Sequence, residues 1–272
     1  MLKFMILSDT HNFERDSAET FPLSGPLPKV DVVLHCGDLT FVGGLSSYKK
    51  ALRMLGDFDA ELRLVIAGNH DLSLDGTYWS SHLGEDDDPA EHEKAMETMT
   101  GPLAHAAGVT YLQEGLHSFT LKSGSSFKIF ASPYQPEFCD WAFGYPRNEG
   151  EQRWNIPKGV DIVMTHGPPL NVLDLCKGGN MGCAALLNEV KSVAPLMHCF
   201  GHIHEGYGVE KKIWNVSNEA QGVVVKVNMA GCEKAAEEYK IERGSSTLMV
   251  NAAIMNEEYK PVNAPILIEL PL

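Results

Sequence analysis

Residues 2–11 read LKFMILSDTH, a short apolar run that stops abruptly at Ser8-Asp9-Thr10-His11. The run from Leu2 to Leu7 has the length of a β-strand, and a nearly continuous apolar run of this length is typical of a strand buried on both faces. Asp9 and His11 follow directly. Because side chains in an extended segment alternate with period two, we expect both to point to the same side.

Four more apolar runs end in the same kind of polar residue. In open α/β sheets, ligands bind beyond the carboxyl ends of the strands, so we expect these strand ends to bring their polar side chains together. The nearby glycines fit positions where the backbone turns sharply or approaches an ion closely. The runs and the residues that follow them are Val32–His35 with Cys36-Gly37-Asp38, Leu64–Ala67 with Gly68-Asn69-His70-Asp71, Ile162–Met164 with Thr165-His166-Gly167, and Met197–Phe200 with Gly201-His202-Ile203-His204.

Helix-like patterns separate some of these strands. Ser46–Leu55 is amphipathic, and Ala184–Val193 follows a glycine and stops before a proline. Strands that alternate with helices favour a layered α/β domain. Near the end of the chain, Ser246–Ala252 and Pro265–Leu270 are expected to be strands that extend a sheet.

The domain organisation follows from the absence of repeats, low-complexity tracts and linkers. We expect a single domain over residues 1–272, with variable insertions near 72–108 and 209–247. The acidic run Glu85-Asp86-Asp87-Asp88 inside the first insertion predicts a solvated loop, because four adjacent acids cannot all converge on one ion in a helix or a strand.

The composition narrows the class of protein. With 44% hydrophobic and 21% charged residues, the chain has the make-up of an ordinary soluble globular protein. Its formal net charge of -14 argues against binding to a nucleic-acid polymer or an anionic membrane, where phosphate contacts need Lys and Arg. A small phosphorylated ligand is still compatible with this charge, because bound cations invert the local field.

The expected location is the cytoplasm. The apolar run at the N-terminus is too short for a signal peptide, and no stretch approaches the ~20 apolar residues of a membrane span. The six cysteines contain no C-x2-C pair. They are therefore expected to be buried, reduced thiols rather than a zinc site or disulfides. The sequence leaves open whether the chain forms a homo-oligomer.

The candidate ligands are Asp, Asn and His, a set that suits Mn, Fe, Zn, Ni or Co better than Ca or Mg. Seven of them are too many for one zinc ion and suit two ions that share a bridging anion at ~3.5–4 Å separation. Asp38, the lone carboxylate at its strand end, is the natural bridge. The sequence thus predicts two divalent transition metals, with Mn, Fe or Zn as the leading choices. The predicted ligands are Asp9, His11, Asp38, Asn69, His166, His202 and His204.

These blocks resemble the signature of the calcineurin-like metallophosphoesterases. That signature is D-x-H, G-D, G-N-H-[DE], a strand-end His and G-H-x-H. It is matched here by Asp9-Thr10-His11, Gly37-Asp38, Gly68-Asn69-His70-Asp71, His166 and Gly201-His202-Ile203-His204. A closer resemblance, over nearly the whole chain, is to the metallophosphoesterase-domain-containing (MPPED-type) proteins, which are grouped with the class III cyclic-nucleotide phosphodiesterases. It is carried by stretches such as Thr165-His166-Gly167-Pro168-Pro169-Leu170.

The resemblance implies a four-layer αββα sandwich, the metallo-dependent phosphatase fold. It implies that Asp9, His11, Asp38 and His204 bind one metal, and that Asp38, Asn69, His166 and His202 bind the other. It further implies that His70 is not a ligand but contacts the phosphate and protonates the leaving oxygen, and that Asp71 orients His70. An alternative for His70 is a structural role behind the ligands.

The sequence departs from many relatives in the residues that follow Gly37-Asp38. These are Leu39-Thr40-Phe41, with no second Asp, and no substrate-gripping Arg follows this block or the Gly68-Asn69-His70 block. This favours a diester or a neutral-flanked substrate over a phosphoprotein.

The resulting hypothesis is a dinuclear metal-dependent hydrolase of small phosphodiesters, cyclic nucleotides included, in which a metal-bound hydroxide attacks phosphorus. Its expected partner is therefore a small phosphorylated substrate. One alternative is a phosphomonoesterase, a pyrophosphatase or another hydrolase acting on a specialised small metabolite. Another is a metal-binding scaffold without turnover, which the complete ligand set argues against.

Several further residues keep two interpretations. His35 and His198 lie next to the motif blocks, either hydrogen-bonded to a ligand or simply satisfied in the core. Trp141, Phe143 and Tyr145 form either an apolar wall for an aromatic group or part of the packing.

Overall fold

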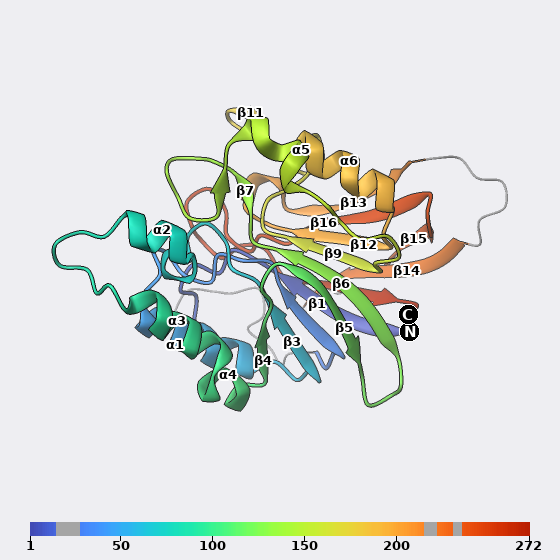
Figure 1. The fold of residues 1–272 in the computed structure, drawn as a ribbon. Coiled ribbons are helices and arrows are strands. Elements are labelled where there is room, and N and C mark those ends of the chain that lie inside the picture. Colours follow the sequence, from blue (N-terminus) through green and yellow to red (C-terminus); the bar gives the residue numbers. More distant parts are fainter. Residues whose placement is uncertain (15–27, 215–221, 231–235) are drawn as a thin grey trace.

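The computed structural model describes residues 1–14, 28–214, 222–230 and 236–272. Figure 1 shows two β-sheets stacked on each other, with α1, α3 and α4 outside one sheet and α5 and α6 outside the other. This arrangement is the four-layer αββα sandwich that the family resemblance implies, and it confirms the layered α/β domain expected from the sequence pattern.

The first sheet contains the N-terminal strand. Strands β1 to β4 run parallel to one another, and β17 and β14 continue the sheet antiparallel on the other side of β1. Among the described residues, the order across the sheet is β15 (Glu237–Glu242), β14 (Gly222–Met229), β17 (Ile266–Leu270), β1 (Leu2–Leu7), β2 (Val32–His35), β3 (Leu62–Val65) and β4 (Val109–Tyr111).

The second sheet also has a parallel centre. Strands β6, β9, β12 and β16 are parallel, and β5 and β13 pair antiparallel at the two edges. In the part of the chain that the structure describes, the order is β13 (Gly208–Ile213), β16 (Ser246–Asn251), β12 (Met197–Phe200), β9 (Ile162–Thr165), β6 (Ser126–Ser132) and β5 (Gly115–Thr120).

The helices and the shorter elements lie outside the sheets or in the loops. The α-helices are α1 (Leu45–Gly56), α2 (Gly76–Ser81), α3 (Glu91–Thr100), α4 (Pro102–Ala106), α5 (Gly150–Arg153) and α6 (Ala184–Val193). The short 3-10 helices are η1 (Leu72–Leu74), η2 (Arg147–Glu149) and η3 (His204–Gly206). Two small ribbons pair β7 (Gln135–Pro136) with β8 (Gly144–Tyr145), and β10 (Leu175–Cys176) with β11 (Gly179–Asn180).

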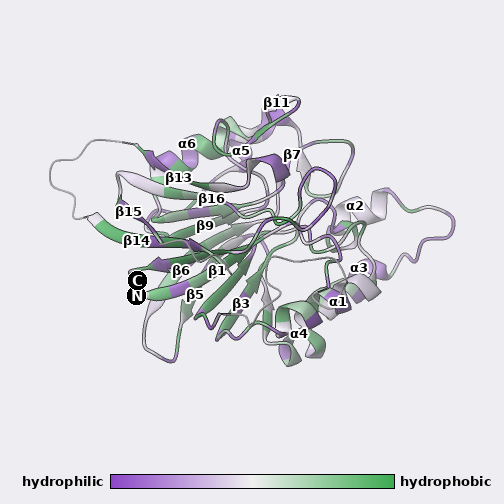
Figure 2. Cartoon of the chain, turned by 180° about the vertical axis from the view of Figure 1, so that it is seen from behind, coloured by the Kyte–Doolittle hydropathy of each residue, from purple (hydrophilic) through white to green (hydrophobic). Residues whose placement is uncertain are grey.

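The position of strand β1 between two hydrophobic cores explains why its sequence is almost continuously apolar. Phe4 and Ile6 point into the core between the two sheets, whereas Met5 and Leu7 point into the core beneath the outer helices. Both faces are therefore buried, as expected for a central strand of a sheet that is covered on both sides. Figure 2 shows the hydrophobic colour concentrated in the strands, and the helices carry hydrophilic residues as well.

The two predicted insertions differ from each other in secondary structure. Residues 72–108 contain η1, α2, α3 and α4, and the described part of 209–247 supplies strands β13, β14 and β15 to the edges of the two sheets. The acidic run at residues 85–88 is exposed, as predicted. Residues 215–221 and 231–235, with Cys232, lie outside the described residues. The one-domain organisation stays a prediction.

The five described cysteines are all free, in agreement with the expected reduced thiols. The expectation that they are buried is wrong for Cys139, which is exposed, and holds only in part for Cys176. In the described residues, no helix has the length and apolar character needed to cross a membrane.

The two sheets determine where the polar strand ends meet. Strands β1, β2 and β3 deliver the residues that follow them from one sheet, and β9 and β12 deliver theirs from the other. Hydrogen bonds join the two sets: His166 contacts Asn69, and the His202 N–H donates to Asp9. The predicted convergence of the five strand ends is therefore present.

Candidate metal centre

All seven predicted ligands lie at this shared edge of the two sheets. Histidine nitrogens and carboxylate oxygens within 4.8 Å of one another form the groups Asp9–His11–His204 and Asp38–His166–His202. Asn69 joins the second group because its Oδ1 lies 2.9 Å from Nε2 of His166. Five of the seven side chains are almost fully buried: Asp9, His11, Asp38, Asn69 and His166.

Asp38 lies between the two groups. One of its carboxylate oxygens, Oδ2, is 3.7 Å from Nε2 of His11 and 3.4 Å from Nε2 of His166. In the first group, Nε2 of His204 is 3.5 Å from Asp9 Oδ1. A carboxylate that faces histidines of both groups is suited to bridge two ions.

In three histidines, a hydrogen bond from Nδ1 to a backbone carbonyl determines which ring nitrogen faces the centre. A backbone carbonyl can only accept, so each Nδ1 that contacts one carries the proton and leaves Nε2 as the ligand atom. This arrangement is the common support of metal-binding histidines. The contacts join His11 to Thr40 O at 3.2 Å, His166 to Cys36 O at 2.9 Å and His204 to Asn256 O at 3.0 Å.

The close contact between two histidines indicates that the site fits a bound cation. Nε2 of His11 and Nε2 of His204 are 3.3 Å apart, and both Nδ1 atoms are already engaged with carbonyls. Two neutral imidazoles held this way point lone pairs at each other, which is unfavourable without a positive charge beside them. The residues therefore fit a bound metal ion.

The pKa values of Asp9 and His166 also indicate that the site needs positive charge. Burial alone would raise the pKa of Asp9, but hydrogen bonding to His204 and the charges of His204 and His166 outweigh it and lower the pKa to about 2. Burial would lower the pKa of His166, yet the charge of Asp38 beside it raises the value to about 9. Without metals, protons on histidines compensate the buried carboxylates, and a divalent ion would replace them.

Several predicted ligands lie on strained backbone. Asp9, His11, Asp38 and His202 have φ values of 56°, 41°, 54° and 67°. Such left-handed conformations are uncommon for residues other than glycine and cluster at functional sites. The neighbouring Gly201 is needed for a different reason, because a Cβ there would lie 2.1 Å from Asp9 Oδ2.

The structure corrects the prediction for Asp71. The contact that fixes the His70 ring is made by the carbonyl oxygen of Phe41, 2.7 Å from Nδ1, and not by Asp71. The buried Asp71 carboxylate instead accepts hydrogen bonds from the turns that carry the ligands. Its donors are Leu39 N at 3.2 Å, Thr40 N at 3.0 Å, Thr40 Oγ1 at 2.8 Å and Gly68 N at 2.9 Å. Its role is to hold two ligand-bearing loops together.

His70 is placed at the edge of the centre. Its backbone N–H donates to Asp38 Oδ1 at 2.8 Å, and its ring stacks on Trp141 with 4.1 Å between centroids. A nitrogen of His70 also lies within 4.8 Å of ligand atoms of His11 and Asp38. The ring is thus close to the metal ligands and lines the adjoining cavity.

The structure decides between the interpretations of His35 and His198. Neither touches a ligand side chain; each contacts a threonine next to one, with His35 Nε2 3.0 Å from Thr10 Oγ1 and His198 Nε2 2.8 Å from Thr165 Oγ1. Both rings are buried, and burial lowers the pKa of each to about 3. They therefore support the ligand-bearing turns as neutral side chains.

The three aromatic residues of the Trp141 segment have different roles. Trp141 stacks on His70 at the site. Phe143 and Tyr145 are buried and pack in two different hydrophobic clusters, so packing is the right interpretation for these two.

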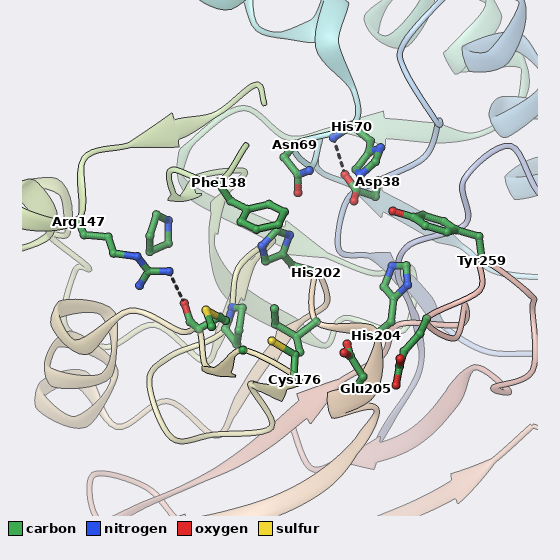
Figure 3. A pocket seen from close by; sticks show the side chains of 16 residues that line it. Asp38, Asn69, His70, Phe138, Arg147, Cys176, His202, His204, Glu205 and Tyr259 are labelled. Carbon is green, nitrogen blue, oxygen red and sulfur yellow. Dashed lines mark hydrogen bonds between the residues drawn. The ribbon is translucent and has the colours of Figure 1, made fainter. Parts of the chain in front are cut away.

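Sequence reasoning missed two residues that surround the centre. Tyr259 packs its ring edgewise on His11 and His204, with centroid distances of 4.9 and 5.2 Å. In Figure 3 its hydroxyl points towards Asp38. Arg147 lines the same cavity from a distant segment. Tyr259 lies in the C-terminal stretch that resembles MPPED-type proteins, which was its only signal, and Arg147 had none.

The comparisons with known proteins agree with this geometry. A family model described as calcineurin-like phosphoesterase matches residues 2–206, a span that includes all seven predicted ligands. The human "Metallophosphoesterase domain-containing protein 1" is 35% identical over 99% of this chain and 71% of its own length, and the mouse protein of that name has the same values. One solved structure, 16% identical, superposes with a TM-score of 0.51 over 76% of this chain and 86% of its own, a likeness of fold.

Replacing Gly201 with alanine is expected to weaken metal binding. The added methyl group would collide with Asp9 Oδ2 and Ser8 Oγ, both 2.1 Å away, and displace the Asp9 carboxylate. We expect an affinity loss of about tenfold or more, as for changes that misplace a ligand. Titration of the metal-free protein with Mn²⁺ measures it. Gly56→Ala, whose added Cβ meets no atom closer than 3.7 Å, is the matched control. Unchanged affinity in Gly201→Ala would contradict the role of Asp9.

Replacing Asp71 with asparagine is expected to destabilise the fold. An amide offers one acceptor oxygen, and its NH₂ group would face N–H donors that now meet a carboxylate. We expect a loss of about 2–4 kcal/mol in the free energy of unfolding, measured by urea denaturation. Asp86→Asn, in the exposed acidic run, is the control. Full stability combined with a large loss of turnover would restore the catalytic interpretation of Asp71.

Proposed function

The chain belongs to the calcineurin-like phosphoesterase family, and from this premise we propose that it is a phosphodiesterase for small diesters. The observation that carries the proposal is the pair of His/Asp groups with Asp38 between them, opening into a cavity of about 470 Å³. A cavity of this size accommodates a small organic ester.

The proposed ligand sets follow the two groups. Asp9, His11, Asp38 and His204 would hold one divalent transition metal, and Asp38, Asn69, His166 and His202 would hold the other. When bound, two such ions supply an activated water molecule at neutral pH and neutralise negative charge that develops on the phosphoryl oxygens.

The cavity lining supports a small substrate with apolar parts. Its apolar lining includes Phe138, Pro136, Pro168, Met181 and Ile203. Phe138 is 58% exposed, so an apolar group of a ligand would find an uncovered ring there. No arginine follows directly after the Gly37-Asp38 or Gly68-Asn69-His70 block. A diester carries a single negative charge, so it needs less cationic help than a phosphomonoester.

His70 is the proposed proton donor to the leaving oxygen. Nδ1 donates to the Phe41 carbonyl, which leaves Nε2 to carry the transferred proton. Stacking on Trp141 fixes the plane of the ring, and the bond from its backbone to Asp38 fixes its distance from the ligands. A ring held in this way beside the predicted ligands is suited to general acid catalysis.

Tyr259 lines the cavity and packs on His11 and His204. Burial, together with the charges of Asp38 and Asp9, raises the pKa of the Tyr259 phenol. At neutral pH the hydroxyl is therefore protonated and is placed to donate a hydrogen bond to a phosphoryl oxygen. Its turn is tied to the centre, because the Asn256 carbonyl accepts from both Tyr259 N and His204 Nδ1.

Metal content and substrate preference test the proposed function together. We expect two Mn²⁺ ions per chain in metal-replete protein. Its turnover of bis(4-nitrophenyl) phosphate should exceed that of 4-nitrophenyl phosphate at least tenfold in kcat/KM. The metal count is measured by elemental analysis and the turnover by nitrophenolate release. Fewer than one metal per chain would contradict the dinuclear centre, and a preference for the monoester would favour a phosphomonoesterase.

The role of His70 is tested through the leaving group. A general acid contributes about 10²–10⁴-fold, and most where the departing oxygen is strongly basic. His70→Ala is therefore expected to lower kcat for diphenyl phosphate about a hundredfold or more. The loss should be much smaller for bis(4-nitrophenyl) phosphate, because nitrophenolate leaves without a proton. Equal losses on both esters, at unchanged metal content, would rule out proton donation by His70.

A further inference from the structure

The cavity beside the metal centre continues away from it to Arg147. In Figure 3 Arg147 lies on the opposite side of the cavity from His70, Asp38 and Tyr259, and Phe138 and His202 lie between. Arg147 belongs to η2, which lies between the Gly68-Asn69-His70-Asp71 block and the block of His166 and is part of neither. The sequence expectation covered only the residues after the Gly37-Asp38 and Gly68-Asn69-His70 blocks, and Arg147 lies outside them.

The Arg147 guanidinium is positioned by backbone carbonyls. One nitrogen donates to Met181 O at 3.1 Å and the other to Gly182 O at 3.5 Å. Met181 is itself part of the cavity lining. A guanidinium has five N–H donors, so these two bonds orient the group and leave donors for a ligand.

Arg147 also differs from other described arginines in its charge environment. Three of them pair with carboxylates: Arg53 with Glu14, Arg153 with Glu114 and Arg243 with Asp161. Within the described residues, Arg147 forms no ion pair with a carboxylate, although the chain carries a net charge of -14. An uncompensated cation on a cavity wall is available to an anionic ligand group.

The charges of the cavity are arranged asymmetrically. Glu205 and Glu257 line the part near His204, and Glu257 is paired with the exposed Lys177. Carboxylates at this wall disfavour an anion there, so an anionic substituent on the substrate is directed towards Arg147. The apolar wall with Phe138 separates the metal centre from the guanidinium.

We propose that Arg147 binds an anionic group on one ester arm of the substrate. The preferred substrates are then phosphodiesters in which an apolar or planar segment, packed on Phe138, joins the phosphorus to a second anionic group. This inference rests on the proposed phosphodiesterase function and specifies its substrate class.

A matched pair of diesters tests the proposal. Each has a 4-nitrophenyl group for detection; the second arm is a 4-(2-carboxyethyl)phenyl group in one and its neutral carboxamide in the other. With the manganese-loaded full chain, kcat/KM is expected to be about tenfold higher for the carboxylate, mostly through KM, because charge-assisted hydrogen bonds are the stronger ones. Arg147→Gln is expected to remove this preference, and Arg147→Lys to retain part of it. Arg53→Gln removes the same charge from α1, outside the cavity, and should keep the wild-type preference.

A binding measurement separates this inference from the proposed function. The two phosphinates in which both arms are joined to phosphorus through CH₂ groups have no ester bond to hydrolyse, and they are titrated calorimetrically into wild-type and Arg147→Gln protein. Tighter binding of the carboxylate by wild type alone supports the Arg147 site even if neither diester is turned over, an outcome that would overturn the phosphodiesterase proposal only. Equal preference in wild type and Arg147→Gln, in turnover or in binding, would overturn the Arg147 proposal and leave diester hydrolysis standing.

Discussion

Two buried carboxylates, Asp9 and Asp38, lie close to inward-facing imidazole nitrogens at one edge of the paired sheets. The site depends on positive charge that compensates these buried carboxylates. A buried carboxylate is costly unless it is paired. Here the partners are histidines, and carbonyl contacts behind His11, His166 and His204 direct Nε2 of each towards the centre. Either protons or metal ions must supply the charge. The 3.3 Å approach of His11 Nε2 to His204 Nε2 is the contact that a bound cation explains most directly.

The surrounding fold maintains this arrangement against strain. Ligands such as Asp9 and Asp38 have positive φ values, which cost free energy in residues with a side chain. The buried Asp71 offsets part of that cost by tying the turn after β2 to the turn after β3. Beneath both turns, β1 to β3 pack on both faces, so the strand ends are fixed by the two hydrophobic cores. Strands position the predicted ligands, whereas segments outside these strands bring Trp141 onto His70, and Arg147 and Tyr259 to the cavity.

The sequence predicts the part of the molecule that is encoded locally. Strand β1 and helix α6 have the predicted bounds, and the other motif-bearing strands differ by at most a few residues, because apolar runs and the turns after them lie close together in the chain. The convergence of the seven ligands follows from the carboxyl-end rule for parallel strands. The predicted role of Asp71 is wrong, because its position next to His70 in the sequence does not indicate which backbone donors surround its buried carboxylate. Tertiary folding brings Arg147 and Tyr259 to the cavity, and no local sequence pattern predicts this position.

The central claim is that two metal ions share Asp38, and anomalous diffraction from crystals grown with Mn²⁺ tests it most directly. The account predicts two anomalous peaks about 3.5–4 Å apart. Each should lie at about 2.0–2.2 Å from a carboxylate oxygen of Asp38. One should also contact Asp9, His11 and His204, and the other Asn69, His166 and His202. A single peak at full manganese loading, or two peaks of which only one contacts Asp38, would contradict it.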